Sequence, residues 1–238
     1  MNRAPDLEVL EQLDRDGFMS VPSMLNAREA DALSAAIDGE HGCRLRNGDR
    51  QFAIRDTLAI PAVTEIAMED RIRRLVESVL TADCVAVRAI VFDKVAGANW
   101  KVPFHQDLTI EVRERREQPG FGPWSIKKGA HCVQPPAEIL RSMVAVRLHL
   151  DEALAENGPL RVLPGSHAHG RLSPVQIDLF RKTTLEVQCL MAKGDALLIR
   201  PLLFHASSAA TRVGHRRVIH IDFGPRTLPG DLEWHRAI

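Results

Sequence analysis

The sequence lacks several features that would point to a partner or a membrane. Its 31 Lys and Arg balance its 31 Asp and Glu across 238 residues, so no charge excess indicates nucleic acid or an anionic membrane surface. No window of about eighteen apolar residues occurs, so we expect no transmembrane helix. The first residues are polar and acidic and do not resemble a secretory signal, so we expect a cytoplasmic protein.

Cysteine is scarce, and the four cysteines form no Cys-x-x-Cys pair. They stand far apart, at Cys43, Cys84, Cys132 and Cys189. This spacing favours reduced thiols over a disulfide framework or a zinc knuckle. Repeats, low-complexity tracts and linkers are also absent, and a chain of this length can form one domain. We therefore expect a single domain over residues 1–238.

Apolar residues recur at helical spacing in the first third of the chain and at strand spacing later. The opening helix is expected to end near Gly17, and Asn26-Ala-Arg-Glu29 has the form of a capping box before a second helix. A third helix is expected near 72–79, a polar loop over 39–58, and a short helix over Ser173–Arg181. Strands are expected near 85–93, 104–110, 143–150, 160–163, 186–190, 195–199, 203–207 and 216–223.

This order of elements predicts an α+β fold. Helices over about 5–80 would pack on one face of a double-stranded β-helix, or jelly roll, over about 85–224. The segment 111–136 is long for a connection within a compact domain, and such segments are often functional. We interpret it as a mobile lid over the site, with Phe121 and Trp124 walling the pocket; the alternative is a surface insertion.

His105-Gln106-Asp107, followed much later by His205, indicates a metal site. In a strand, residues two apart point to one face, so His105 and Asp107 can hold the same ion while Gln106 points away. A third ligand must come from another strand, and His205 follows a long apolar run. Two imidazoles and one carboxylate on one face of a metal are the arrangement of non-haem Fe(II) oxygenases.

Arg216 opens another apolar run, and a buried arginine is costly unless an anion pairs with it. An arginine beside a metal site suggests a bound carboxylate ligand. Ser207 lies two residues after His205 and would point the same way, so its hydroxyl can share that carboxylate. Asp222 and Arg217 are expected to form a solvated pair.

Several ordered motifs resemble the phytanoyl-CoA dioxygenase-like family of Fe(II)/2-oxoglutarate oxygenases, from about residue 10 to 224. They are the opening helix with Gly17-Phe18, then Phe104-His-Gln-Asp107, Glu156-Asn-Gly-Pro-Leu-Arg-Val-Leu-Pro-Gly-Ser-His167, Lys193-Gly-Asp195, and Pro201-Leu-Leu-Phe-His-Ala-Ser207. The resemblance implies Fe(II) as the metal, with 2-oxoglutarate and O₂ as co-substrates. It also implies that Arg216, helped by Ser207, anchors the distal carboxylate of 2-oxoglutarate.

The resemblance further implies oxidation of a small-molecule substrate with release of succinate and CO₂. Because Asp107 is present, where related halogenases have a small residue, hydroxylation is favoured over halogenation. Desaturation, ring closure and epimerisation use the same ligands and remain open. A cupin-like isomerase that does not use 2-oxoglutarate, and an inactive scaffold that acts as a binding protein, are the rival interpretations.

The substrate is the least determined part of the prediction. Arg147 stands where the family usually has an aromatic residue; it can pair with 2-oxoglutarate, with a substrate carboxylate, or with Asp151 or Glu152. His149 is a second candidate for substrate contact, although a core position is the simpler interpretation. Arg88, Arg147 and the arm Arg44-Leu-Arg46 hint at an anionic substrate. We expect a monomer or homodimer.

Overall fold

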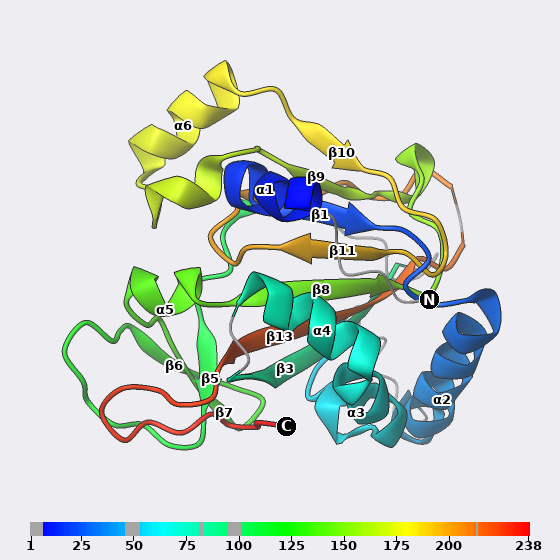
Figure 1. The fold of residues 1–238 in the computed structure, drawn as a ribbon, viewed down its shortest axis with the longest axis horizontal. Coiled ribbons are helices and arrows are strands. Elements are labelled where there is room, and N and C mark those ends of the chain that lie inside the picture. The colour runs from blue at the N-terminus through cyan, green and yellow to red at the C-terminus, as the bar shows by residue number, and fades with distance from the viewer. Residues whose placement is uncertain (1–6, 46–52, 81–82, 95–100, 213) are drawn as a thin grey trace.

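A computed structural model describes residues 7–45, 53–80, 83–94, 101–212 and 214–238 (Figure 1). Its largest element is a six-stranded antiparallel sheet in the order β1-β11-β8-β13-β3-β2. The strands are β1 (Phe18–Val21), β2 (Ala53–Ile54), β3 (Cys84–Asp93), β8 (Val144–His149), β11 (Ala196–Ile199) and β13 (Arg217–Pro225). This sheet brings together segments from both ends of the chain.

A second, four-stranded sheet has the order β10-β9-β12-β4. Its strands are β4 (Val102–His105), β9 (Leu160–Val162), β10 (Val187–Cys189) and β12 (His205–Ser207). Strands β4 and β12 are antiparallel, and His205 lies directly opposite His105. The ladder shifts between His205 and Ser207, which is an irregularity typical of strands next to functional sites. Two imidazoles from distant segments therefore meet at one point of this sheet.

A third, three-stranded sheet has the order β5-β7-β6, with β5 (Ile110–Val112), β6 (Trp124–Lys127) and β7 (Ala130–Val133). The β6–β7 turn places Lys128 and Gly129 at φ 49° and 88°. Two consecutive residues with positive φ are what a two-residue hairpin loop of the right twist requires. The segment expected to be a lid, 111–136, therefore contains a hairpin over 124–133.

The helices are α1 (Leu7–Asp16), α2 (Ala27–Leu45), α3 (Pro61–Met68), α4 (Asp70–Val79), α5 (Ala137–Arg141) and α6 (Pro174–Thr183), with short 3₁₀ turns at η1 (Thr57–Ala59), η2 (Ala155–Asn157) and η3 (Ser166–His169). Helices α3 and α4 cover one face of the six-stranded sheet, with α2 beside them (Figure 1).

The capping box before α2 is confirmed: Asn26 N–H donates to Glu29 (2.7 Å), and Glu29 N–H donates to Asn26 (3.0 Å). Among the described helices, none is long and apolar enough to cross a membrane.

Strand β8 shows how the sheet divides apolar from functional residues. Val144, Val146 and Leu148 belong to the core cluster that contains the helix side chains. The alternate position Ala145 belongs to a cluster that includes Leu197 of β11 and other residues of both sheets. Because side chains alternate along a strand, the positions between the two sheets are those of Ala145, Arg147 and His149.

The predicted fold class is confirmed, a jelly-roll core with helices on one face, and most predicted strands lie within a residue or two of the observed ones. Two expectations were wrong. The strand expected over 104–110 is two strands, β4 and β5, separated by Gln106–Thr109. The loop expected over 39–58 overlaps α2, which continues to Leu45; residues 46–52 of that range lie outside the described residues.

Candidate metal centre and its cationic cavity

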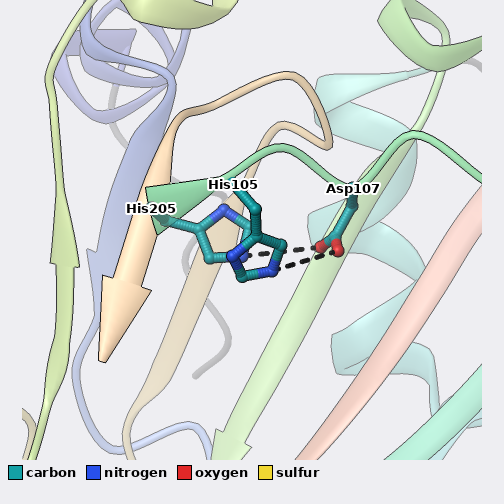
Figure 2. A group of neighbouring side chains, drawn as sticks. All are labelled: His105, Asp107 and His205. Atoms are coloured by element: carbon teal, nitrogen blue, oxygen red, sulfur yellow. Dashed lines mark ion pairs between the residues drawn. The ribbon is translucent and has the colours of Figure 1, made fainter. Parts of the chain in front are cut away.

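Three side chains converge at the end of β4 and the start of β12 (Figure 2). The Nε2 atom of His105 lies 3.8 Å from one carboxylate oxygen of Asp107, and Nε2 of His205 lies 3.7 Å from the other. One ligand atom from each of the three lies within 4.8 Å of the others. Asp107 follows the strand and has no partner in the sheet's strand pairing. Its position is fixed instead by its backbone N–H, which donates to the Pro201 carbonyl (2.9 Å).

The far side of each imidazole is bound to the backbone. Nδ1 of His105 lies 2.9 Å from the Pro103 carbonyl, and Nδ1 of His205 lies 2.8 Å from the Leu203 carbonyl. A carbonyl accepts, so Nδ1 must carry the proton and Nε2 presents its lone pair toward Asp107. Metal-binding histidines generally show this arrangement, in which the second nitrogen fixes ring orientation and tautomer.

The electrostatics keep this group ready to bind a cation. Burial lowers the pKa of His205 to about 4, against the opposing effect of Asp107, so the ring is neutral at neutral pH. Burial would raise the pKa of Asp107, but His205, His220 and Arg88 outweigh it and hold the pKa below its ordinary value. The 3.7–3.8 Å separations are too long for hydrogen bonds but suit ligand atoms that each lie about 2 Å from one ion. The donor set therefore fits a metal with open positions.

Gln106, on the other side of the motif, ties the metal strand to two loops. Its amide nitrogen donates to the carbonyls of Gly170 (2.8 Å) and Leu202 (2.6 Å), and its amide oxygen accepts from Leu172 N–H (2.9 Å). The expectation that it points away from His105 and Asp107 agrees with these contacts. Its three hydrogen bonds hold the backbone of Gly170, Leu172 and Leu202 next to the metal strand.

The triad opens into a cavity of about 220 Å³. Seven residues singled out from the sequence lie along this one cavity: His105, Asp107, His205, Ser207, Arg216, Arg147 and Arg88. Its apolar wall includes Ile90, Phe92 and Leu160. The structure thus brings the predicted metal and anion residues into contact with the same space.

Arg216 is 3% exposed, and its Nε has no hydrogen-bond partner among the described groups. Burial, and then the nearby Arg147, lowers its pKa to about 9. Ser207 Oγ lies 3.2 Å from Nζ of Lys94, whose pKa is lowered to about 7 by burial and by Arg216. A buried guanidinium in this state favours an anionic ligand.

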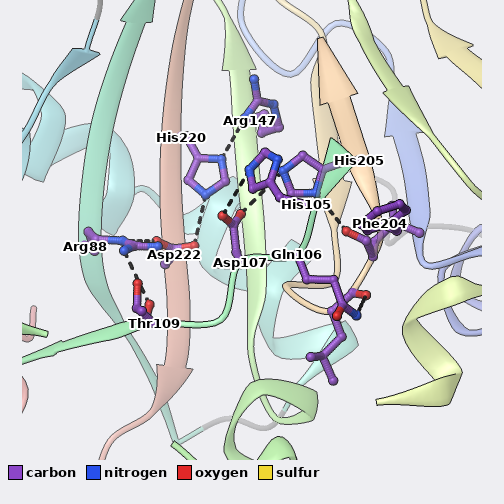
Figure 3. A network of polar contacts seen from close by, with 12 residues as sticks. Arg88, His105, Gln106, Asp107, Thr109, Arg147, Phe204, His205, His220 and Asp222 are labelled. Atoms are coloured by element: carbon purple, nitrogen blue, oxygen red, sulfur yellow. Dashed lines mark hydrogen bonds and ion pairs between the residues drawn. The ribbon is translucent and has the colours of Figure 1, made fainter. Parts of the chain in front are cut away.

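A second set of polar contacts crosses the inner face of the six-stranded sheet (Figure 3). Arg88 donates to Asp222 (2.6 Å), His220 Nε2 lies 3.0 Å from Asp222, and Arg147 donates to His220 Nδ1 (2.8 Å). Since Arg147 can only donate, Nδ1 of His220 accepts and Nε2 carries the proton toward Asp222. Burial opposes the charge of Asp222, but Arg88 and His220 hold its pKa well below the ordinary range.

The expected solvated pair of Asp222 with Arg217 is wrong. Arg217 instead contacts Asp93 and Asp38, each at 3.1 Å, and Asp222 is 2% exposed. The two residues stand an odd number of positions apart on β13, so their side chains leave opposite faces of the sheet. Arg217 belongs to the outer, helix-covered face, and Asp222 to the inner face.

Three expected substrate contacts do not lie along the cavity. Phe121 and Trp124 pack against an apolar cluster that includes Val112, Leu232 and Trp234 and do not line the cavity, so the structure does not support the expectation that these rings wall the pocket. The β6–β7 hairpin offers Lys127 to the cavity instead. His149 is 1% exposed, neither ring nitrogen bonds to a described group, and burial with Arg147 holds its pKa well below 6.5.

Five residues near the site were not singled out for it from the sequence, or were given another role. They are Arg55, Lys94, Lys127, His220 and Asp222. The sequence did offer a signal for two of them. His220 and Asp222 lie an even number of residues after Arg216, so on one strand their side chains share its face. For Arg55 and Lys127 the sequence offers no such signal, since neither stands in a motif.

Solved structures with this fold share little sequence with the chain. AviO1 from Streptomyces viridochromogenes Tue57 is 18% identical, with a TM-score of 0.69 over 96% of this chain and 99% of that one. EctD from S. alaskensis with bound Fe is 17% identical, TM-score 0.71, over 94% and 79%. The epimerase SnoN, solved in complex with Fe3+, alpha ketoglutarate and nogalamycin RO, is 16% identical, TM-score 0.67, over 94% and 90%.

No curated protein matches the sequence. The family comparison does match, over most of the chain: residues 13–218 fit the model of Phytanoyl-CoA dioxygenase (PhyH). That range contains the metal triad, Ser207 and Arg216, and it ends within β13. The chain therefore belongs to the phytanoyl-CoA dioxygenase family.

Proposed function

We propose that the protein is an Fe(II)- and 2-oxoglutarate-dependent dioxygenase, formed as one domain, that hydroxylates a small molecule. The observation that carries this proposal is the shared cavity: the triad and a buried arginine without a carboxylate partner face the same space. Family membership and the iron and alpha ketoglutarate in the SnoN structure support the choice of metal and co-substrate. A buried arginine that can bind the distal carboxylate of 2-oxoglutarate favours this proposal over a cupin-like isomerase that does not use the co-substrate.

His105, Asp107 and His205 would hold the iron, and Arg216 with Ser207 would hold the distal carboxylate of 2-oxoglutarate. Iron and 2-oxoglutarate held there would, with O₂, supply the oxidising chemistry, with succinate and CO₂ as co-products. The protein's own side chains contribute by positioning the iron and the co-substrate. The backbone bonds to both Nδ1 atoms orient the imidazoles, and the guanidinium of Arg216 sets the direction of the co-substrate.

Asp107 supports oxygenation over halogenation, because its carboxylate occupies the ligand position that a halide would need. Relatives in fold are named as a carbocyclase, SnoK, and an epimerase, SnoN, so ring closure and epimerisation are the alternatives to hydroxylation. The free, buried state of Cys84, Cys132 and Cys189 supports a reducing, cytoplasmic setting.

Succinate formation from 2-oxoglutarate tests the proposal. We expect it to require Fe(II) and to fall more than about 100-fold in Asp107→Ala, since losing even a group that only orients metal ligands costs 10–100-fold. Iron content, measured by elemental analysis, should fall with it. Asp178→Ala, an exposed carboxylate on α6, is the control and should match the wild type. Iron-independent succinate formation, or full activity of Asp107→Ala, would contradict the proposal.

A further inference from the structure

We propose that the substrate carries an anionic group, a carboxylate, phosphate or sulfate, that Arg55 and Lys127 bind at the mouth of the metal cavity. This inference rests on the proposed function, because it concerns the molecule oxidised at that site. It begins from the charges along the cavity. Five cationic side chains line it, Arg55, Arg88, Lys127, Arg147 and Arg216, against one carboxylate, that of Asp107.

One of these cations is neutralised by the chain itself. Arg88 lies 2.6 Å from Asp222 and 3.9 Å from Glu111, so its charge has carboxylate partners inside the protein. No other cation of the cavity has an ion pair with a residue that the structure describes. Four positive charges therefore remain for ligands.

The expected metal and co-substrate account for only part of this excess. A divalent ion, the Asp107 carboxylate, a 2-oxoglutarate dianion and Arg216 cancel one another. Arg147, Arg55 and Lys127 are left over. Arg147 is 5% exposed, donates to His220 and packs 5.6 Å above the Phe92 ring, so it lies deep in the cavity. A cavity that stays positive after the co-substrate has bound favours an anionic substrate over a neutral or cationic one.

Arg55 and Lys127 are more exposed than Arg147 and Arg216, and we therefore assign them to the mouth of the cavity. Arg55 follows β2, which pairs with β3 through Ile54 and Val91, and it is half-buried. Lys127 is exposed and ends β6 at the tip of the hairpin. Burial and then Glu111 raise the pKa of the Cys132 thiol, and Lys127, Arg88 and Arg55 all oppose this rise from nearby. Two segments far apart in sequence thus direct charge to one place.

Besides its charged residues the cavity has apolar ones along its lining, Ile90, Phe92, Val102 and Leu160. An anionic group at Arg55 and Lys127 would leave the rest of the molecule along this wall, toward His105 and Asp107. The substrate class is therefore an organic anion with an apolar portion, and the oxidised carbon belongs to that portion. The sequence had suggested Arg88 and the arm Arg44-Leu-Arg46 for this role. Arg88 is already paired, and the side chains of the arm lie outside those described.

Binding of hexyl phosphate, compared with 1-hexanol, tests the inference. The protein is loaded anaerobically with Fe(II) and N-oxalylglycine, a non-reacting analogue of 2-oxoglutarate, and titrated calorimetrically. We expect hexyl phosphate to bind at least about tenfold more tightly than 1-hexanol. Each of Arg55→Gln and Lys127→Gln should weaken its binding about tenfold, the effect of losing one hydrogen bond to a charged group. Added salt should weaken binding as well.

Two controls match the variants in type. Lys128→Gln changes the neighbouring lysine of the same hairpin, and Arg28→Gln changes an exposed arginine on α2; neither residue lines the cavity. Equal binding of the alcohol and the phosphate, no binding of either, or equal effects of Lys127→Gln and Lys128→Gln would overturn the inference. Failure of the proposed function is separate, because it would show as absent iron-dependent succinate formation in the wild-type protein.

Discussion

Two buried arginines on the cavity wall differ in what neutralises them. Arg88 on β3 contacts Asp222, and the charges of Asp222, Asp107 and Glu111 outweigh burial and raise its pKa above the ordinary value. Arg216, just before β13, is 3% exposed, against 13% for the Arg88 side chain, and it has no carboxylate contact among the described residues. Burial and Arg147 lower its pKa to about 9.

The difference separates a structural cation from a binding one. A buried charge without a partner is unfavourable. Arg216 therefore lowers the stability of the ligand-free protein, and an anion that binds it restores that stability. At Arg88 the partner is part of the fold, and its removal should harm the fold. At Arg216 the partner is expected to be the co-substrate, and removal of the arginine should harm binding.

The largest effect on stability should come from Asp222→Asn. This change leaves Arg88 without its closest carboxylate, and the asparagine keeps one acceptor oxygen for the two donors, Arg88 Nε and His220 Nε2. Breaking a buried pair from one side costs about 3–5 kcal/mol. Urea unfolding of the metal-free protein measures it, with the exposed Asp178→Asn as the control, expected within about 0.5 kcal/mol of the wild type. Equal stability of the two variants would remove the distinction drawn for Arg88.

Arg216→Ala should weaken the apparent affinity for 2-oxoglutarate by about 2–5 kcal/mol, because a buried carboxylate loses its charged partner. The iron requirement should change far less, and the ligand-free protein should not lose the stability that Asp222→Asn loses. Succinate formation at varied 2-oxoglutarate and at varied iron separates these effects. Arg217→Ala is the matched comparison, because its contacts to Asp93 and Asp38 are structural. A larger co-substrate effect in Arg217→Ala would mean that the roles of the two arginines are exchanged.

Trp124→Ala should cost about 1–3 kcal/mol of stability, less than the loss for a fully buried tryptophan. The ring packs in the apolar cluster beside β5 and β7 and does not line the cavity. The ratio of succinate formed to substrate oxidised should therefore stay at its wild-type value. Succinate outrunning product in this variant would restore Trp124 to the pocket and revive the lid interpretation.

A further prediction concerns pH and Lys94, which lies beside Ser207. An unfolded chain holds the lysine proton up to about pH 10.5, whereas the folded protein holds it only to about pH 7. Between these values the unfolded state binds more protons, so the stability of the ligand-free protein rises with pH. Below about pH 7 Lys94 is protonated in both states, so it no longer makes the free energy of unfolding depend on pH. Lys94→Met should flatten the rise, as measured by urea unfolding from pH 6 to 10, and an unchanged slope would assign it to other groups.

The sequence predicted the jelly-roll class and most of its strands because apolar alternation is local. It also placed His105, Asp107 and His205 as ligands, and the structure brings them together even though Asp107 lies just beyond β4. The resemblance added 2-oxoglutarate and the role of Arg216. What could not be predicted depends on which strands are neighbours. The contact of Arg88 with Asp222 needs β3 to lie beside β13, with a shift in their ladder after Asp222.

The hairpin is a different kind of omission, because its signal was present. Trp124 and Ile126 alternate with polar residues, and Gly129 stands in the turn. The length of the segment drew attention to its aromatic rings, although the residue that reaches the cavity is Lys127. The direction of Lys127, the last residue of β6, depends on the twist of the two strands, which composition does not report.

The pairing of His205 with His105 has a consequence for the chain as a polymer. These positions lie a hundred residues apart, so an ion held by both closes a loop of that length, and the entropy of closing a loop changes only slowly with its size. An ion that binds the folded state alone also lowers the unfolded fraction as its free concentration rises. Iron would thus act as a reversible cross-link between two segments that are distant in the sequence. Pulse proteolysis at controlled iron should detect it, and equal cleavage with and without iron would exclude it.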